Sequence, residues 1–274
     1  MNVIPKMNLS LPERETAFHN QWAESEDVDS ILVDESFESE TTPENRRIVQ
    51  WLGDIHGLSI LDLGCGCGEA SVYFAKRGAR VTASDLSSGM LDLTKRVGEK
   101  HGVTLETVEC GSESLPFPDG TFDIVYGANV LHHSNLEKAL SEVKRVLKPG
   151  GRACFWDPLA NNPIINVYRR MAHQVRTADE HPLTSRDLAT IRATFPHAEF
   201  RYYWFFTLAV FLKFYLIDWV HPNTERYWKK VIREAGRNAW LYRPLAFLDR
   251  IVLTICPPAR WFCWNVVACA KKES

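Results

Sequence analysis

The sequence lacks an uninterrupted apolar run of the roughly 20 residues that a membrane-spanning helix needs. Its most apolar stretch, residues 207–220, is interrupted by Lys213 and Asp218. No apolar segment follows a basic start at the N-terminus, so we expect no signal peptide. With 45% hydrophobic and 24% charged residues among 274, the chain has the composition of a soluble globular protein. Its length allows one α/β domain with substantial additions.

Cysteine pairs with the spacing of a metal site are lacking as well. The seven cysteines are an odd number and are scattered through predicted strands and loops, a pattern typical of reduced thiols. Cys65 and Cys67 are two residues apart, but no second pair follows at zinc-site spacing. We therefore expect no disulfide framework, no metal and a cytoplasmic location, with peripheral contact at a membrane left open.

An overall basic excess is also missing. The net charge is −2 and the isoelectric point is near 6.5, which argues against a nucleic-acid partner. The charge is nevertheless divided, because residues 1–45 carry 11 acidic and 2 basic groups whereas residues 201–274 carry 12 basic and 5 acidic groups. Either the acidic arm packs on the basic end, within one chain or between subunits, or a basic surface is kept for a phosphate or an anionic membrane. A homo-oligomer stays open.

The most informative pattern is an apolar strand that runs into a glycine turn and then a helix, over residues 60–75. Three glycines alternate in the turn: Gly64, Gly66 and Gly68. Such a turn brings backbone N–H groups close to a ligand. A dinucleotide dehydrogenase would place its third glycine one residue later, where this chain has Glu69. Glu69 and the preceding Asp62 favour a cationic ligand over a pyrophosphate, and S-adenosylmethionine carries ammonium and sulfonium charges.

The next predicted strand, residues 79–84, is followed by Asp85, about 20 positions after the glycine turn. Folds of this kind use an acidic residue there to bind ribose hydroxyls. We expect Asp85 to do so, with Leu86 and Met90 flanking the adenine.

Five segments in this order resemble the class I S-adenosylmethionine-dependent methyltransferases, and more closely the small-molecule branch that includes the ubiquinone and menaquinone C-methyltransferases. The segments are residues 62–68, 85–91, 113–123, 129–133 and 147–152. The resemblance implies S-adenosylmethionine as cofactor and a doubly wound, mostly parallel, seven-stranded Rossmann-like sheet. The cofactor-binding residues it implies are Asp62, Gly64, Cys65, Gly66, Gly68, Asp85, Leu86, Met90, Ser112, Glu113 and Asn129.

One segment departs from the family. Relatives usually carry Asp-Ala-Glu before Leu-Pro-Phe, the aspartate binding the adenine amino group, and this chain has Gly111, Ser112 and Glu113. The Ser112 hydroxyl, a backbone carbonyl or water must then accept that hydrogen bond. One such bond is worth roughly 0.5–1.5 kcal/mol, so we expect cofactor binding to survive with modest affinity.

The order of predicted elements divides the chain into five parts. Predicted strands at 58–63, 79–84, 104–109, 122–127 and 151–156 alternate with helices at 69–77, 87–101 and 135–147, which is a βαβ series. A sixth strand is expected near 198–206 and a last one at 261–270. The parts are an N-terminal arm and lid helix (1–42), the cofactor-binding core (43–158), an acceptor-site segment (159–206), a helical insertion (207–257) and the last strand (258–274).

Three other segments carry expectations. Residues 1–9 are expected to be disordered, and a helix is predicted over 12–24. Residues 225–240 form an amphipathic pattern with a basic face. The insertion that contains them is expected to act as a buried lid, a subunit interface or, through 207–240, a membrane-surface segment.

Candidate catalytic residues are three histidines. Methyl transfer is an in-line attack that needs a base only if the acceptor must lose a proton. His132 follows the fourth strand and is favoured over His133, while His19 on the arm and His181 are further candidates. Trp22 and Tyr168 are candidates to line the acceptor cavity. Arg169, Arg170 and Arg176 are candidates to hold an anionic acceptor.

The fourth strand is not followed by the Asn-Pro-Pro-Tyr segment of enzymes that methylate nucleobase or glutamine nitrogens. We therefore expect a small, largely apolar acceptor such as a lipid, prenyl or polyketide-like compound. A membrane-surface lipid methyltransferase and an S-adenosylmethionine-binding cyclase or regulator without methyl transfer are the alternatives.

Overall fold

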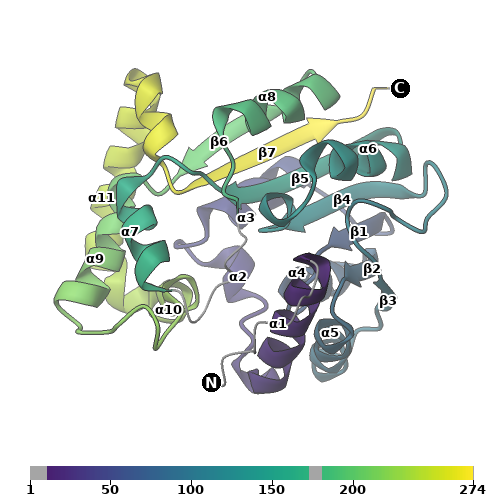
Figure 1. Ribbon diagram of the computed structural model, residues 1–274, viewed down its shortest axis with the longest axis horizontal. Coiled ribbons are helices and arrows are strands. Elements are labelled where there is room, and N and C mark those ends of the chain that lie inside the picture. Colours follow the sequence, from purple (N-terminus) through teal and green to yellow (C-terminus); the bar gives the residue numbers. More distant parts are fainter. Residues whose placement is uncertain (1–10, 173–180, 274) are drawn as a thin grey trace.

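The computed structural model describes residues 11–172 and 181–273 and is built on one seven-stranded sheet (Figure 1). The strands are β1 (Ser59–Leu63), β2 (Arg80–Asp85), β3 (Glu106–Glu109), β4 (Phe122–Ala128), β5 (Leu147–Pro158), β6 (Glu199–Tyr203) and β7 (Asn265–Lys271). Their order is β3-β2-β1-β4-β5-β7-β6, and only β7 runs antiparallel to its neighbours. The predicted doubly wound, mostly parallel sheet is therefore confirmed.

Helices cover both faces of the sheet. One apolar cluster lies between the sheet and the helices α3 (Pro43–Leu52), α4 (Glu69–Lys76) and α5 (Ser88–Lys100). A second cluster lies on the opposite face, under α6 (Leu136–Val146) and α8 (Ser185–Thr194). Neighbouring strand residues such as Ile60 and Leu61 belong to different clusters and are both fully buried. Alternate side chains of the central strands thus supply two cores, as expected for a parallel sheet.

The segment around the predicted insertion has an aromatic core of its own. It contains α7 (Pro163–Met171), α9 (Ala209–Leu216), α10 (Tyr227–Arg233) and α11 (Ala235–Ile255). The buried aromatic residues of this core are Tyr168, Trp204, Phe211, Phe214, Tyr227, Tyr242 and Trp264. This end of the molecule therefore has an apolar core in addition to the two sheet cores.

One prediction for this part of the chain was wrong in detail, and one helix was not predicted. The amphipathic pattern over 225–240 is not one helix, because the chain leaves helical geometry at Glu234 (φ −103°, ψ 24°) and α11 continues from there to Ile255. Helix α7 was not predicted at all. The sequence indicates its start through Asn162, a common N-cap residue, and Pro163 at the first helical position. In the structure the Asn162 side chain accepts a hydrogen bond from the Ile165 backbone N–H at 3.0 Å.

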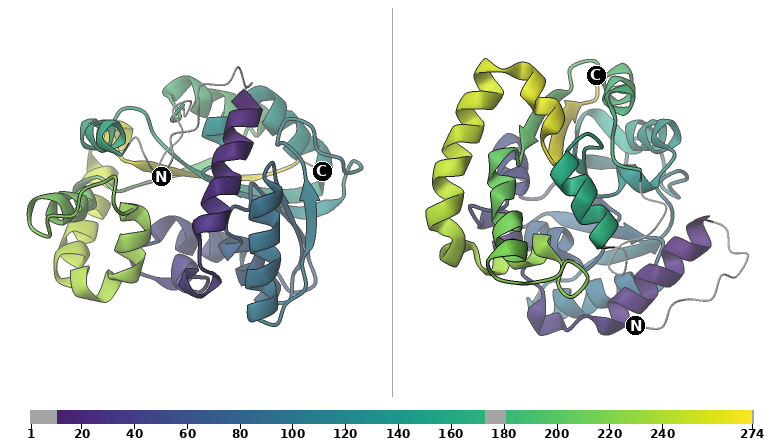
Figure 2. Two further views of the ribbon diagram at one scale, coloured as in Figure 1. Left: turned by 60° about the horizontal axis from the view of Figure 1, so that its bottom comes forward. Right: turned by 60° about the vertical axis from the view of Figure 1, so that its left-hand side comes forward.

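At the other end of the molecule, α1 (Leu11–Ser25) lies along α5, as the left view of Figure 2 shows. Asn20 Oδ1 accepts hydrogen bonds from Ser87 Oγ at 2.6 Å and the Gly89 amide at 3.0 Å. A Cβ at Gly89 would lie 3.4 Å from Cβ of Ala23, so this glycine lets the helices approach closely. The short helix α2 (Glu35–Glu38) follows.

The predicted disordered tail, residues 1–9, falls outside the described part of the chain. Within the described part, no helix combines the length and apolar character required to span a bilayer.

Candidate functional site

The glycine turn between β1 and α4 has left-handed backbone geometry. Gly64, Gly66 and Gly68 have φ angles of 68°, 52° and 86°, a region that side chains disfavour. A Cβ at Gly64 would lie 2.9 Å from Val130 Cγ2, and one at Gly68 would lie 2.8 Å from Thr94 Oγ1. A Cβ at Gly66 would meet no protein atom within 4 Å. The outer glycines are therefore required by packing, while Gly66 faces open space.

Asp85 stands at the end of β2 beside this turn. Its Oδ2 accepts a hydrogen bond from the Gly66 amide at 3.0 Å, and its Oδ1 accepts one from the Ser87 amide at 2.9 Å. Burial raises the pKa of Asp85, against the Ser87 hydrogen bond and the charge of His19. The carboxylate is thus fixed at the loop, next to the place where a ribose is expected.

Asp62 lies beneath the turn rather than on its surface. It is buried, and its Oδ2 accepts a hydrogen bond from Ser71 Oγ at 2.5 Å. Burial raises the pKa of Asp62 to about 7, and the charges of Glu69 and Asp85 act in the same direction. In this arrangement Asp62 ties β1 to α4, and its role in cofactor binding stays a prediction.

The apolar residues expected around the adenine differ in exposure. Leu86 is 40% exposed, whereas Met90 has no exposed surface and belongs to a sheet core. Met90 is thus fully buried, and its contact with the adenine stays a prediction, as does that of Leu86. Cys65 is also buried, with Sγ 3.4 Å from Thr94 Oγ1.

The polar residues expected near the adenine lie after β3 and β4. Ser112 Oγ is 2.6 Å from Ser134 Oγ, and Glu113 accepts a hydrogen bond from the Asn135 amide at 2.7 Å. Asn129 is exposed, with φ of 55°. Glu113 therefore supports the start of α6, whereas Ser112 and Asn129 remain predicted cofactor contacts. A Cβ at Gly111 would meet only Leu86 Cδ2, at 3.4 Å.

His132 is paired with a carboxylate that the sequence reasoning missed. Its Nδ1 lies 2.8 Å from Asp157 Oδ1, and its backbone N–H donates to the same oxygen at 3.2 Å. Both side chains are buried, and burial raises the pKa of Asp157 to about 8. Asp157 Oδ2 is buried without a hydrogen-bond partner in the described residues. The sequence did contain one indication of this role, because Asp157 lies near the carboxyl end of its strand, as Asp62 and Asp85 do.

The other predicted histidines lie at different distances from this pair. The His133 ring is 4.1 Å from that of His132 and 6.4 Å from that of His19, between ring centroids. His133 Nδ1 is also 3.5 Å from Glu15 Oε2 on α1. Thus His133, rather than His132, is the ring next to α1. His181 is exposed and joins the group through its backbone, whose N–H donates to the His132 carbonyl at 3.1 Å.

The predicted acceptor-site residues have mostly structural contacts. Tyr168 is buried in the aromatic core, and Arg169 donates to Asn166 Oδ1 at 2.7 Å and to the Leu159 carbonyl at 3.1 Å. Arg170 is exposed, and Arg176 lies outside the described residues. In the described residues, no three His, Cys, Asp or Glu side chains gather as a metal site.

The acidic arm packs on the basic helices within the chain. Glu26 lies 2.8 Å from Lys229 Nζ and 3.4 Å from Arg226 Nη1, and the Arg226 guanidinium stands 4.0 Å over the Trp22 ring. Although burial acts to raise the pKa of Glu26, the Lys229 hydrogen bond and charge lower it overall. Helix α1 is therefore held at α5 on one side and at the start of α10 on the other.

Residues 61–155 match the family model described as a methyltransferase domain. The matched residues include the glycine turn, Asp85 and His132. The chain contains a class I S-adenosylmethionine-dependent methyltransferase domain.

Relatives of this methyltransferase domain share only part of their length with the chain. A demethylmenaquinone methyltransferase of Thermus thermophilus is 41% identical over 96 residues, which are 34% of this chain and 44% of that protein. The chain spans less than half the length of the first curated relatives it matches.

Solved structures extend the likeness in fold to the whole chain. Geranyl diphosphate C-methyltransferase from Streptomyces coelicolor A3(2) has a TM-score of 0.60 at 17% identity, over 98% of this chain and 100% of that one. The [4+2]-cyclase SpnF has a TM-score of 0.56 at 15% identity, over 96% of both chains. At such identities the likeness shows a shared fold.

Proposed function

We propose that the protein transfers a methyl group from S-adenosylmethionine to a small, largely apolar acceptor. The observation that carries the proposal is the Asp85 carboxylate held at 3.0 Å from the Gly66 amide, inside the matched methyltransferase domain. Asp85 then binds the ribose hydroxyls, Leu86 packs on the adenine, and the glycine turn allows the backbone to approach the cofactor.

The residues around His132 support a role in proton removal. When bound, the cofactor supplies an electrophilic methyl group on its sulfonium, and the protein aligns the acceptor and excludes water. His132 accepts a proton from an acceptor hydroxyl or acidic carbon, and Asp157 orients its ring through Nδ1. Helix α1, with His19 facing His133, covers this site as a lid.

The acceptor class follows from the aromatic end of the molecule. The core around Trp204 and Tyr168 stands next to the carboxyl ends of the strands, where ligands of such sheets bind. Relatives named for a demethylmenaquinone, a sterol or a fatty acid act on apolar molecules. A hydroxylated quinone, a fatty acid and a prenyl compound are therefore the acceptors to try first.

The test is incubation with methyl-labelled S-adenosylmethionine and each of these acceptors. We expect a labelled product and S-adenosylhomocysteine in equal amounts with at least one acceptor, and neither with Asp85→Ala. The fold shared with a cyclase supports the second candidate, a cofactor-binding protein without methyl transfer. Tight cofactor binding with no S-adenosylhomocysteine from any acceptor would favour that candidate.

A further inference from the structure

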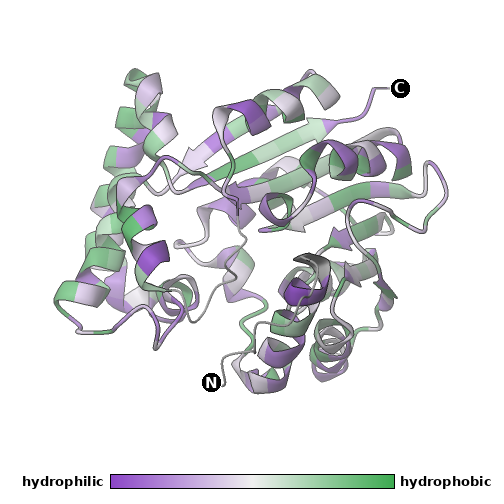
Figure 3. Cartoon of the chain, in the orientation of Figure 1, coloured by the Kyte–Doolittle hydropathy of each residue, from purple (hydrophilic) through white to green (hydrophobic). Residues whose placement is uncertain are grey.

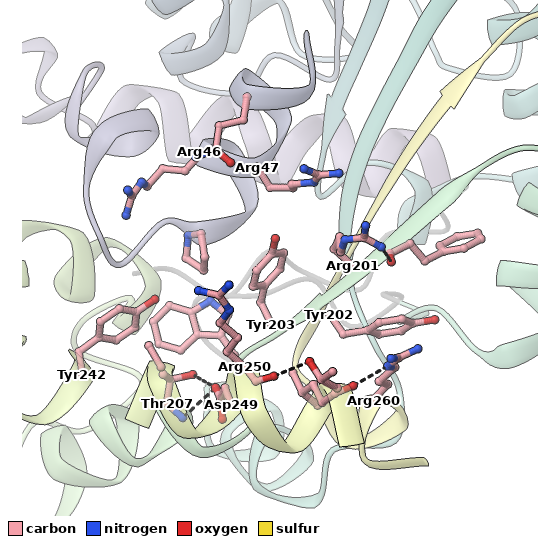
Figure 4. A pocket seen from close by; sticks show the side chains of 17 residues that line it. Arg46, Arg47, Arg201, Tyr202, Tyr203, Thr207, Tyr242, Asp249, Arg250 and Arg260 are labelled. Carbon is pink, nitrogen blue, oxygen red and sulfur yellow. Dashed lines mark hydrogen bonds between the residues drawn. The ribbon is translucent and has the colours of Figure 1, made fainter. Parts of the chain in front are cut away.

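A cavity of about 690 Å³ lies between α3, β6 and α11 (Figure 4). None of its lining residues belongs to the glycine turn, and neither Asp85 nor His132 contributes to it. Its volume is in the range of small-molecule sites, which is roughly 300–1,000 Å³. The cavity is therefore a second candidate site, apart from the one assigned to the cofactor.

Positive charge dominates its lining. The arginines are Arg46, Arg47, Arg201, Arg250 and Arg260. The one carboxylate in the lining, Asp249, is buried and accepts hydrogen bonds from the Phe206 amide at 2.6 Å and Thr207 Oγ1 at 2.8 Å. Asp249, which belongs to α11, is thus hydrogen-bonded by residues 205–207 and forms no ion pair with the lining arginines within 4.0 Å in the described residues.

Two of the arginines are placed to receive an anion. Glu199 pairs with Arg47 at 3.1 Å and with Arg201 at 3.6 Å, but Arg46 and Arg250 have no carboxylate within 4.0 Å in the described residues. Arg250 extends from α11 toward α3 in Figure 4. Arg47 Nε is buried without a hydrogen-bond partner in the same part of the chain.

Neutral donors and apolar walls complete the lining. Three tyrosines line it: Tyr202, Tyr203 and Tyr242. Burial raises the pKa of each of them, so they keep the hydroxyl proton and can donate it to an anion. Trp204 and Leu253 provide apolar surface beside the charges.

The cavity continues into an exposed apolar stripe on α11. At 100° per residue, Arg250 and Thr254 form the edge of the cavity face, and the next sector of the helix is apolar and exposed. That sector contains Trp240, Pro244, Phe247, Leu248, Ile251 and Ile255. Figure 3 shows green, apolar segments alternating with pale and purple ones along this helix. Exposed apolar patches of this kind mark interaction sites.

We propose that the cavity binds an anionic amphiphile, with a phosphate or carboxylate head against Arg46 and Arg250 and an apolar tail along the α11 stripe. The charged end matches the unpaired arginines, and the stripe gives an alkyl or prenyl tail a surface that leads out of the cavity. This site contains neither the glycine turn nor Asp85 nor His132, although Trp204 belongs both to its lining and to the aromatic core beside which the acceptor is proposed. Its occupation does not depend on the cofactor.

The test is calorimetry with dodecyl phosphate below its critical micelle concentration, in the absence of cofactor. We expect saturable binding of one molecule and at least tenfold weaker binding with Arg46→Gln or Arg250→Gln, because each removes a charge-assisted contact. Arg237→Gln, an exposed change on the same helix outside the cavity, should stay within twofold. Both cavity arginines are exposed, so their replacement should leave the thermal unfolding temperature unchanged.

Further measurements test the apolar tail and the anionic head of the ligand separately. Phe247→Ser with Ile251→Ser should weaken dodecyl phosphate severalfold and leave butyl phosphate unchanged. Equal affinity for dodecanol would overturn the anionic head, and equal affinity for inorganic phosphate would overturn the amphiphile. Binding to phosphatidic acid vesicles without binding of the monomeric ligand would also overturn it, in favour of a membrane surface. Unchanged affinity in both arginine variants would place the ligand elsewhere.

Discussion

His132 Nδ1 lies 2.8 Å from Asp157 Oδ1, where the carboxyl ends of the paired strands β4 and β5 lie side by side. His132 follows β4, and Asp157 belongs to β5. A second contact, from the His132 backbone N–H, fixes the carboxylate against the turn itself. A histidine held by a buried carboxylate has a defined ring orientation, which is what a positioned base requires.

We expect Asp157→Asn to lower turnover by about 10²-fold or more, because the amide no longer holds the imidazole in its orientation. Cofactor affinity should stay within twofold. The measurement is steady-state kinetics as a function of pH on an acceptor that must lose a proton. His181→Gln is the matched control, since His181 contacts His132 through its backbone, and it should retain near-normal turnover. Equal losses in both variants would remove the pair from the mechanism.

Gly111→Asp should tighten cofactor binding by about 1 kcal/mol, because it restores an acceptor for the adenine amino group. The change is sterically open, since a Cβ there meets only Leu86 Cδ2 at 3.4 Å. Calorimetry with S-adenosylhomocysteine measures the effect, and Gly111→Ala is the control that adds the Cβ without the acceptor. Weaker binding in the aspartate variant alone would show that this segment does not face the adenine.

Asn20→Ala should loosen α1 and reduce turnover about tenfold. Its Oδ1 accepts from Ser87 Oγ and the Gly89 amide, directly after the residues assigned to the ribose and adenine. Two lost hydrogen bonds correspond to roughly 1–3 kcal/mol. Hydrogen exchange along residues 11–25 together with kinetics tests this, and Glu24→Ala, an exposed change on the same helix, is the control. Faster exchange with unchanged turnover would mean that α1 is not a functional lid.

The sequence predicted the sheet and most elements because strand periodicity, glycine turns and helix starts are local signals. Contacts between distant segments were harder to predict. The pair of His132 with Asp157 and the support of Ser87 by Asn20 depend on which strand ends and helices come together in space. Met90 is a further example, because the sequence predicted an adenine contact for it but did not indicate that its side chain is fully buried.

The charge division illustrates the same distinction. Composition predicted opposite charges at the two ends, whereas the fold pairs them through Glu26 with Lys229 and Glu40 with Arg243. The cavity between α3, β6 and α11 had no sequence signal, since its arginines come from four separate segments.

Stability should fall as the pH rises from about 5 to 8. Burial raises the pKa of Glu44 to about 7, as it does that of Asp62, so the folded state keeps protons that the unfolded state loses above about pH 4.5. Glu44→Gln retains an oxygen that can accept from Asn265 Nδ2, a contact of 2.6 Å. This variant should lose about 1–3 kcal/mol less free energy of unfolding between pH 5 and 8 than the unmodified protein. Urea unfolding at several pH values measures it. An unchanged slope would show that Glu44 is ionised in the folded protein.

The most direct test of the account is the affinity of the intact protein and of Asp85→Ala for S-adenosylmethionine, measured by calorimetry. We predict binding in the low to middle micromolar range, about −7 to −8 kcal/mol. Asp85→Ala should weaken it at least tenfold, because a charge-assisted hydrogen bond contributes about 1.5–3 kcal/mol. Asp92→Ala, on the exposed side of α5, should bind like the unmodified protein. No binding by the unmodified protein, or equal affinity in the Asp85 variant, would contradict the assignment of this site.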